Sequence, residues 1–322
     1  MALLEVRGLK THFVTRAGTV RAVDGVDFAL GEGESLGLAG ESGCGKTTAA
    51  LSIMRLLPAN GRIVEGSILY GGYDLTKLSA DHVRWFRWKH ISIIFQGAMN
   101  ALNPVKRVGV QIAEPIILHD GVDKNAAMKR VGDLLELVGI HRDRATEYPH
   151  EFSGGMRQRV MIAMALACNP KIVIADEPVT ALDVMIQAQI LDLLERLKRE
   201  LGLSMILISH DLSVMAETCD SMVIMYAGKI VESGPVRAVF KTPNHPYTRD
   251  LLAAFPDIEG SRALPAYIPG LLPSLIDPPR GCRFHPRCKF AWQTCVDHEP
   301  PLEPVGLSHR SACHLNTSEP PR

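Results

Sequence analysis

The chain has 322 residues, of which 46% are hydrophobic and 22% are charged. These proportions are typical of a folded chain with a sizeable core, and the length favours one large domain followed by a smaller one. The 35 lysines and arginines balance the 35 aspartates and glutamates. No overall positive field therefore attracts nucleic acid or an anionic membrane, and we expect no nucleic-acid partner.

The sequence contains no stretch that approaches the roughly 18 apolar residues of a membrane-spanning helix. The N-terminal MALLEVRGLKTHF also lacks the long apolar segment of a secretory signal, so a cytoplasmic location is expected. Reducing conditions there make the seven cysteines poor candidates for disulfides.

Short apolar runs alternate with longer segments of helical periodicity over the first 240 residues. This alternation predicts an α/β fold with a mostly parallel sheet flanked by helices. The clearest helix follows Asp183, a typical N-cap residue, and ends before Gly202. We place strands at residues 35–39, 90–95, 171–176, 204–209 and 221–226. Prolines and clustered cysteines dominate after about residue 240, which predicts a domain at 1–240 and an extension at 241–322.

A glycine-rich segment, GESGCGKT, runs from Gly40 to Thr47 and matches the pattern G-x-x-x-x-G-K-[ST]. It lies after a predicted strand and before a helical segment, the context that a phosphate-binding loop requires. Glycines let backbone N–H groups approach phosphate oxygens, and the helix presents its positive end to the same charge. We predict that Lys46 contacts the β- and γ-phosphates of ATP and that the Thr47 hydroxyl binds Mg²⁺.

The loop also contains Cys44, which lies near the N-terminus of the predicted helix. Such a position favours a thiolate. We therefore expect thiol reagents to slow ATP hydrolysis and bound ATP to protect. The alternative is a small residue that merely fits the loop.

Two acidic residues, Asp176 and Glu177, end the apolar run KIVIADEP. Buried parallel strands deliver side chains at their carboxyl ends, where ligands bind in α/β sheets. Asp176 is predicted to hold Mg²⁺, and Glu177 to act as the general base that polarises the attacking water. The alternative is a solvated acidic turn.

Further motifs occur in a characteristic order along the chain. Gln96 follows the strand at 90–95, Ser153-Gly154-Gly155 opens a helix, ALDV follows the acidic pair, and His210 follows the next strand. Together with the phosphate loop, residues 1–240 closely resemble the ATP-binding cassette ATPases of ABC transporters. The resemblance implies a P-loop NTPase ABC cassette with an antiparallel β subdomain and a helical subdomain at about residues 97–165.

The resemblance also implies how these residues act. Two cassettes clamp ATP between the phosphate loop of one and the Ser153–Gly155 segment of the other, and Asp183 crosses the seam. His210 contacts the γ-phosphate and orients the water beside Glu177, so that Glu177, His210, Lys46 and Gln96 form the catalytic set. Gln96 senses Mg²⁺ and links to the membrane subunit. Phe13 stacks on adenine, with Val20 as a smaller substitute. The expected nucleotide contacts of the loop are Gly40, Ser42, Gly43, Cys44, Gly45, Lys46, Thr47 and Thr48.

The C-terminal extension carries a second set of signals. TPNHPYTRDLLAAFP (242–256) and GCRFHPRC (281–288) resemble the extension of the oligopeptide, dipeptide and nickel importer ATPases. Cys282, Cys288, Cys295 and Cys313 have the spacing C-x5-C-x6-C-x17-C, which suits either Zn²⁺ or a [4Fe–4S] cluster. The resemblance favours the cluster, so a small irregular metal-binding extension is expected. The alternative is four buried thiols.

The resemblance thus predicts the ATP-hydrolysing motor of a peptide importer, located peripherally at the cytoplasmic face of the cell membrane. Its expected partners are two transmembrane permease subunits, a second ATPase subunit that is a paralogue, and, indirectly, an extracytoplasmic solute-binding protein. An importer of nickel or another small solute, a soluble non-transport ABC ATPase, and a regulator whose cluster senses redox state are the alternatives.

Overall fold

The computed structural model describes residues 2–97, 101–254 and 268–316. Its contacts divide it into two compact units. The first comprises Met1–Gly31, Ser35–Thr76 and Ser209–Arg322, and the second comprises Glu32–Glu34 and Lys77–Ile208. Residues 98–100 of the expected helical subdomain, and residues 255–267 and 317–322 of the expected extension, lie outside the described residues.

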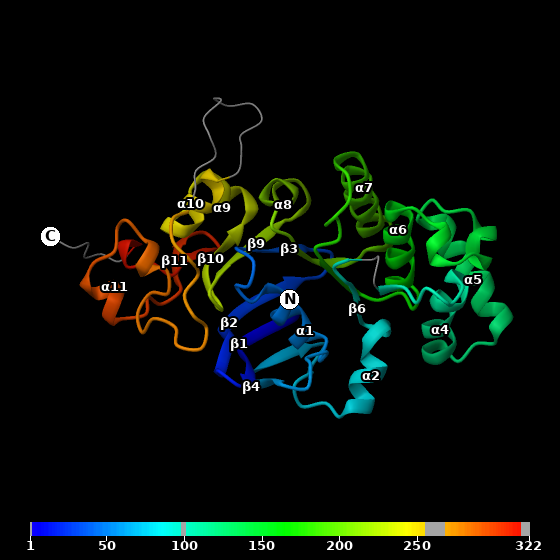
Figure 1. Ribbon diagram of the computed structural model, residues 1–322, viewed down its shortest axis with the longest axis horizontal. Coiled ribbons are helices and arrows are strands. Elements are labelled where there is room, and N and C mark those ends of the chain that lie inside the picture. The colour runs from blue at the N-terminus through cyan, green and yellow to red at the C-terminus, as the bar shows by residue number, and fades with distance from the viewer. Residues whose placement is uncertain (1, 98–100, 255–267, 317–322) are drawn as a thin grey trace. The chain divides into compact units, whose positions relative to one another are not determined.

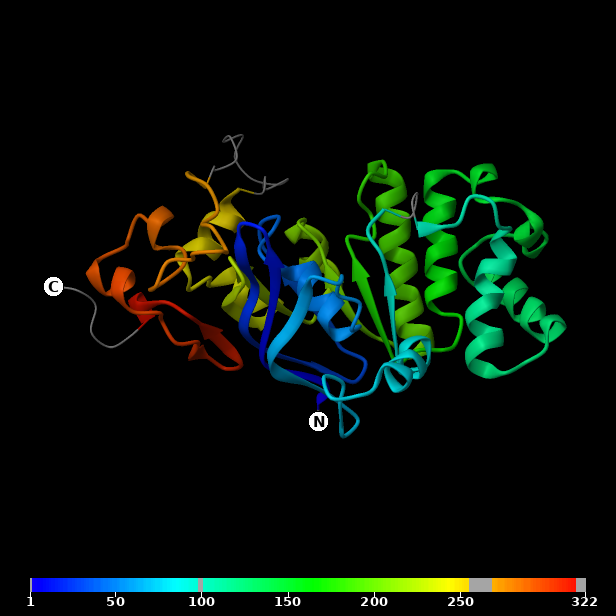
Figure 2. The same cartoon turned by 60° about the horizontal axis from the view of Figure 1, so that its bottom comes forward.

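The first unit contains an antiparallel sheet of long strands, which run side by side in Figures 1 and 2. Leu4 and Val6, in one of its two inner strands, are both buried. They lie on the same face of the sheet because alternate side chains of a strand point to the same side. The antiparallel β subdomain implied by the resemblance is therefore present. The strand order is β2 (Gly18–Gly31), β1 (Ala2–Thr15), β4 (Gly61–Tyr70) and β5 (Tyr73–Asp74).

A second set of strands in this unit carries the loop at residues 40–45. The parallel strands β3 (Ser35–Ala39) and β9 (Ser221–Tyr226) have the predicted bounds. Beyond β9 the pairing becomes antiparallel through β10 (Lys229–Pro235), β12 (His309–Ser311) and β11 (Glu303–Gly306), an edge that was not predicted. The helices are α1 (Lys46–Ile53), α8 (Leu212–Thr218), α9 (Val236–Lys241), α10 (Pro246–Ala253) and α11 (Gln293–Asp297).

A buried carboxylate ties the C-terminal segments to β10. Glu232 is fully buried and accepts hydrogen bonds from the backbone N–H groups of Asn244 (2.7 Å) and His245 (2.9 Å). Its side chain also bonds Nε2 of His309 in β12 at 2.7 Å. Buried charges need such partners, so these bonds hold the turn before α10 and the strand β12 in place.

The second unit has a parallel core in which β6 (Ile91–Ile94), β7 (Ile172–Asp176) and β8 (Ser204–Ile208) pair in that order. Every residue of the three strands is buried, as expected for parallel strands covered on both faces. Each lies within the range predicted for it. The helices are α2 (Ala80–Lys89), α4 (Val108–Asp120), α5 (Lys124–Leu137), α6 (Gly154–Ala165) and α7 (Val184–Leu201).

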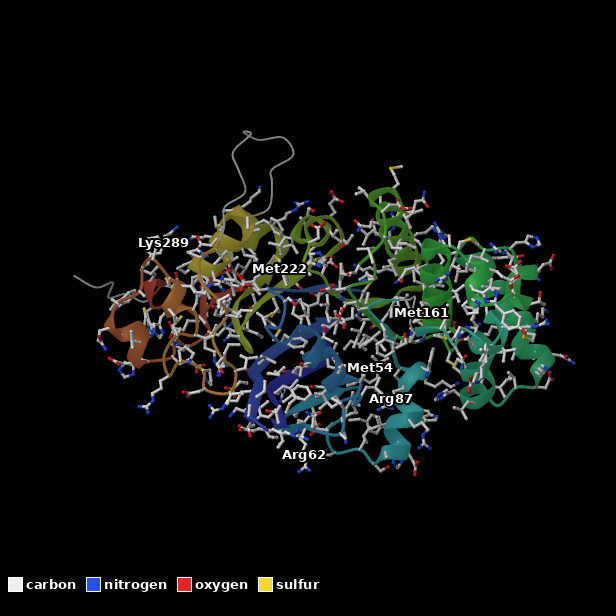
Figure 3. All side chains as sticks on the ribbon, viewed as in Figure 1. Met54, Arg62, Arg87, Met161, Met222 and Lys289 are labelled. Atoms are coloured by element: carbon white, nitrogen blue, oxygen red, sulfur yellow. The ribbon has the colours of Figure 1, made fainter. Side chains whose placement is uncertain are left out.

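Helix α7 begins and ends where the sequence predicts. The Asp183 side chain accepts the N–H of Ile186 at 3.0 Å, and Gly202 ends the helix in the left-handed conformation with φ 62°. Figure 1 shows α6 and α7 side by side, and Figure 3 labels Met161 of α6, whose side chain is buried. Within the described ranges, no helix has the length and apolar character needed to cross a membrane.

Candidate nucleotide-binding site

The glycine loop of the first unit connects β3 to α1 and packs directly against neighbouring backbone. A Cβ atom on Gly40 would lie 2.2 Å from the Met225 carbonyl oxygen, and one on Gly45 would lie 2.3 Å from that of Ala22. Both glycines also have positive φ, 141° and 111°. Only glycine fits such positions without strain, so the loop conformation depends on this sequence.

We expect Gly40→Ala to destabilise the chain by at least about 2 kcal/mol, because the added methyl meets a backbone oxygen that cannot move aside. Gly43 is a matched control, since its φ is 81° but a Cβ there meets nothing within 4 Å. Gly43→Ala should therefore cost only about 1 kcal/mol of conformational strain. Urea unfolding without nucleotide measures both free energies, and equal losses would contradict the packing argument.

Lys46, the first residue of α1, is buried, and its amine forms hydrogen bonds with the loop that precedes the helix. Nζ donates to the carbonyl oxygens of Gly40 at 2.7 Å and Glu41 at 3.0 Å. Ser42 and Gly43 of the loop are exposed, as is Thr47 in the first turn of α1. The arrangement places a cation, a helix N-terminus and accessible loop atoms together, as a phosphate site requires.

Cys44 corrects one prediction from the sequence. Its side chain is completely buried, and its carbonyl accepts the Gly228 N–H at 2.9 Å. Burial raises the pKa of the Cys44 thiol, because the charged thiolate would lose its hydration. The expected reactive thiolate is therefore wrong, and Cys44 is a small residue that fits the loop.

Native Cys44 is accordingly expected to resist alkylation by iodoacetamide at about pH 8.5, where an ordinary thiol is half ionised. Peptide mapping by mass spectrometry measures the labelling of each cysteine with time. The partly exposed Cys219 serves as the internal control. Labelling of Cys44 as fast as Cys219 in the folded chain would contradict its burial.

In the second unit, three of the predicted site residues meet at the carboxyl ends of β6 and β7. Asp176 ends β7 and is 2% exposed, and Glu177 follows it with φ 46°. Gln96 Nε2 donates to Glu177 Oε2 at 2.8 Å, and Thr180 Oγ1 donates to the same oxygen at 2.8 Å. The structure thus fixes the orientation of the predicted general base.

The Ser153-Gly154-Gly155 segment lies at the start of α6, close to the start of α7. Ser153 caps α6, with Oγ 3.4 Å from the Met156 nitrogen. A Cβ on Gly155 would lie 2.6 Å from Cγ2 of Ile186, so the glycine allows the two helix starts to approach. Asp183, which caps α7, is exposed beside them. The predicted contacts of both segments with a second cassette remain predictions.

The remaining predicted residues, His210 and Phe13, belong to the first unit. His210 is exposed just before α8. The Phe13 ring is half-buried, and a Cβ on Gly61 would lie 2.7 Å from it. Val20 lies opposite Phe13 in the β1–β2 pairing. Adenine stacking on Phe13 stays a prediction.

The four C-terminal cysteines line one cavity of the first unit, together with His245, Phe284, His285, Phe290 and Trp292. None of them forms a disulfide. Burial raises the pKa of Cys282 to about 12 and that of Cys313 to about 11. The backbone N–H groups of Phe284, Phe290 and Leu315 act in the opposite direction and lower the pKa of Cys282, Cys288 and Cys313, but burial outweighs them.

Among the described residues, no group of three or more His, Cys, Asp or Glu side chains is arranged to hold a metal ion. The predicted metal-binding character of the extension is therefore not confirmed. The four thiols do share a cavity, which a larger group bound through several sulfurs would require.

A strand, a loop with the G-x-x-x-x-G-K-[ST] pattern and a helix that starts at its lysine define a P-loop nucleoside triphosphatase. Residues 23–180 match the family model of the ABC transporter, and residues 231–295 match that of the oligopeptide/dipeptide transporter, C-terminal region. The ATP-binding cassette MJ0796, in a dimeric post-hydrolysis structure bound to ADP and Pi, has a TM-score of 0.65 at 26% identity. The match covers 73% of this chain and 99% of that one.

Curated relatives match over nearly the whole chain. The oligopeptide transport ATP-binding protein OppD of Bacillus subtilis is 49% identical over 95% of this chain and 87% of its own length. The dipeptide transport ATP-binding protein DppD of Escherichia coli is 43% identical over 98% and 97%. The chain therefore belongs to the ATP-binding proteins of the oligopeptide/dipeptide ABC transporter family and is an ATPase.

Proposed function

We propose that this chain is the motor subunit of an importer that couples ATP binding and hydrolysis to the uptake of di- or oligopeptides. One observation carries the proposal: a single chain joins an ABC cassette to an oligopeptide/dipeptide transporter C-terminal region. Relatives named for peptide transport match both parts together.

In this proposal the glycine loop and Lys46 bind the phosphates, while Thr47, Gln96 and Asp176 hold Mg²⁺. Glu177 takes a proton from the attacking water, and His210 orients that water and the γ-phosphate. The hydrogen bonds from Gln96 and Thr180 support this role for Glu177, because they fix its carboxylate.

Two cassettes would close on ATP, with Ser153–Gly155 and Asp183 of each chain facing the partner. The related cassette MJ0796 forms a dimer, which supports this arrangement. We propose that the partner is a paralogous ATPase and that both dock on two transmembrane permease subunits at the cytoplasmic face of the membrane. An extracytoplasmic solute-binding protein would deliver the peptide, and nucleic acid would play no part.

The four cysteines are proposed to hold a [4Fe–4S] cluster that crosslinks the C-terminal extension. Their common cavity supports this proposal, because a cluster is bound by several cysteine sulfurs around one space. The cluster would supply a structural crosslink for a segment with little regular structure. Anaerobic purification should yield about four irons per chain, and one zinc per chain would contradict the assignment.

Reconstitution of the chain with its permease subunits and partner ATPase in proteoliposomes tests the transport function. Accumulation of labelled peptide should require ATP and the solute-binding protein, and should stop with Glu177→Gln. Accumulation of nickel without peptide would indicate the nickel-importer alternative. ATPase activity that ignores the permease subunits would contradict an importer role.

A further inference from the structure

Residues of the C-terminal extension form hydrogen bonds with Glu41 of the phosphate loop, a contact that the sequence motifs did not predict. Tyr247 Oη, in α10, accepts the Glu41 N–H at 2.8 Å. The Glu41 carboxylate accepts two bonds from Arg287, Nη1 to Oε2 at 2.7 Å and Nη2 to Oε1 at 2.9 Å. Glu41 is thus held through both its backbone and its side chain by residues more than 200 positions later.

Arg287 uses its whole set of donors in this contact. Besides Glu41, Nη1 donates to Tyr226 Oη at 3.2 Å. Nη2 donates to the Ile268 carbonyl at 3.1 Å, and Nε donates to the Pro269 carbonyl at 2.9 Å. A guanidinium has five N–H donors in a fixed plane, and lysine has only three on a flexible stem. With its side chain 5% exposed, Arg287 has a single orientation, directed at the loop.

The charge of Glu41 explains why this contact matters. Its side chain is 23% exposed and belongs to the loop that must receive the negative phosphates of ATP. An unpaired carboxylate there would repel the nucleotide, whereas the two-fold ion pair with Arg287 neutralises it. The Tyr247 bond fixes the first peptide of the loop beside it.

We propose that Arg287 and Tyr247 are positioning residues for the phosphate loop, by which the C-terminal extension sets the affinity of the cassette for ATP. The proposal rests on the assignment of residues 40–48 as the nucleotide site. Arg287 directly precedes Cys288, so the loop that carries the cysteines also aims the guanidinium. Arg287 is part of the segment GCRFHPRC, in which the sequence alone points to a role for the cysteines and not for the arginines.

Binding of a fluorescent ATP analogue, followed by titration, tests the proposal. Arg287→Met should raise the Kd about tenfold, the effect of losing one charge-assisted interaction. Adding Glu41→Gln to Arg287→Met should restore most of the affinity, since it removes the unpaired carboxylate. In steady-state hydrolysis the KM for ATP should rise while kcat stays within about twofold. Lys289→Met, on the other side of Cys288 and paired with Asp250 at the surface, is the control and should bind ATP normally.

Figure 3 labels Lys289 on the C-terminal segment, where its side chain is 66% exposed. If Arg287→Met folds poorly, Arg287→Lys is a milder variant. Its Kd for the ATP analogue should lie between those of the wild type and Arg287→Met. An unchanged Kd in Arg287→Met or Arg287→Lys, or no rescue by Glu41→Gln, overturns the proposal alone. Failure of the wild-type chain to bind the analogue overturns the nucleotide-site assignment with it.

A second observation concerns His245, which lines the cysteine cavity and is 1% exposed. Its Nδ1 accepts the Tyr247 N–H at 3.0 Å, so the proton of the neutral ring lies on Nε2. That Nε2 has no hydrogen-bond partner among the described residues. Buried donors are nearly always satisfied, so this one indicates a missing acceptor.

We infer that the His245 Nε2–H donates a hydrogen bond to a sulfide of the proposed cluster, on which this inference rests. A donor to sulfur offsets negative charge that increases on reduction, so it raises the reduction potential. His245 is the N-cap residue of α10. His245→Asn keeps this cap, because the Asn side-chain oxygen can accept the Tyr247 N–H, and it removes the Nε2 donor. His245→Gln removes the cap but carries an amide donor near the Nε2 position.

Redox titration of anaerobically purified protein, followed by visible absorption and electron paramagnetic resonance, compares the midpoint potentials at measured iron and sulfide contents. His245→Asn should have a lower potential than wild type, and His245→Gln should lie close to wild type. Equal potentials of wild type and His245→Asn at full iron content overturn the inference alone. A wild-type chain without iron overturns the cluster assignment together with it.

Discussion

Glu177→Gln is expected to slow ATP hydrolysis at least about 100-fold while ATP still binds, because an amide cannot take the proton of the attacking water. The structure makes this a clean substitution. The hydrogen bonds that Gln96 and Thr180 donate to the Glu177 side chain reach the same oxygen, Oε2. The amide oxygen of glutamine can take that position and keep the bonds from Gln96 and Thr180.

The release of inorganic phosphate measures the rate of ATP hydrolysis. Size-exclusion chromatography with ATP and the partner ATPase measures the dimer, which should persist longer with Glu177→Gln than with the wild-type chain. Glu195→Gln is the matched control, because Glu195 lies on the surface of α7 near Arg199. This control variant should hydrolyse ATP at the wild-type rate. Hydrolysis by Glu177→Gln at the wild-type rate would exclude Glu177 as the general base.

Lys46→Met is expected to weaken ATP binding by about 100-fold, because methionine matches the length of lysine but lacks the charge that meets the phosphates. The substitution also removes the bonds from Nζ to the Gly40 and Glu41 carbonyls. ATP stabilises the folded chain in proportion to the logarithm of its concentration over Kd. The rise in Tm on adding ATP should therefore disappear in this variant.

The Tm without nucleotide separates this effect from damage to the fold. Lys10→Met is a control in the same unit, where Lys10 pairs with Glu65 on the antiparallel sheet. It should keep the full rise in Tm with ATP. A normal rise in Lys46→Met would show that the Lys46 ammonium does not contact the phosphates.

These expectations concern a nucleotide site whose parts were recognisable from local sequence. The G-x-x-x-x-G-K-[ST] pattern, the apolar run ending in Asp176 and the caps of α7 each depend on neighbours in the chain. Local steric and hydrogen-bonding rules act at that range, so the bounds of β3, β9 and α7 agree with prediction.

The behaviour of Cys44 shows where local rules fail. A helix N-terminus favours a thiolate, and the sequence placed Cys44 beside one. The fold covers the sulfur completely, and the cost of burying a charge outweighs the attraction of the neighbouring Lys46. Burial is a property of packing, which residues 40–47 alone do not determine.

The sequence by itself determined the class of fold, the phosphate loop, the acidic strand end and the family, because each is encoded by residue types at short, regular spacings. Only the tertiary structure decided that Arg287 and Tyr247 hold Glu41, and that His245 shares a cavity with the cysteines. These contacts join residues far apart in the chain. Their partners follow from how the extension packs, and the free energy of that packing is distributed over many side chains that carry no local pattern.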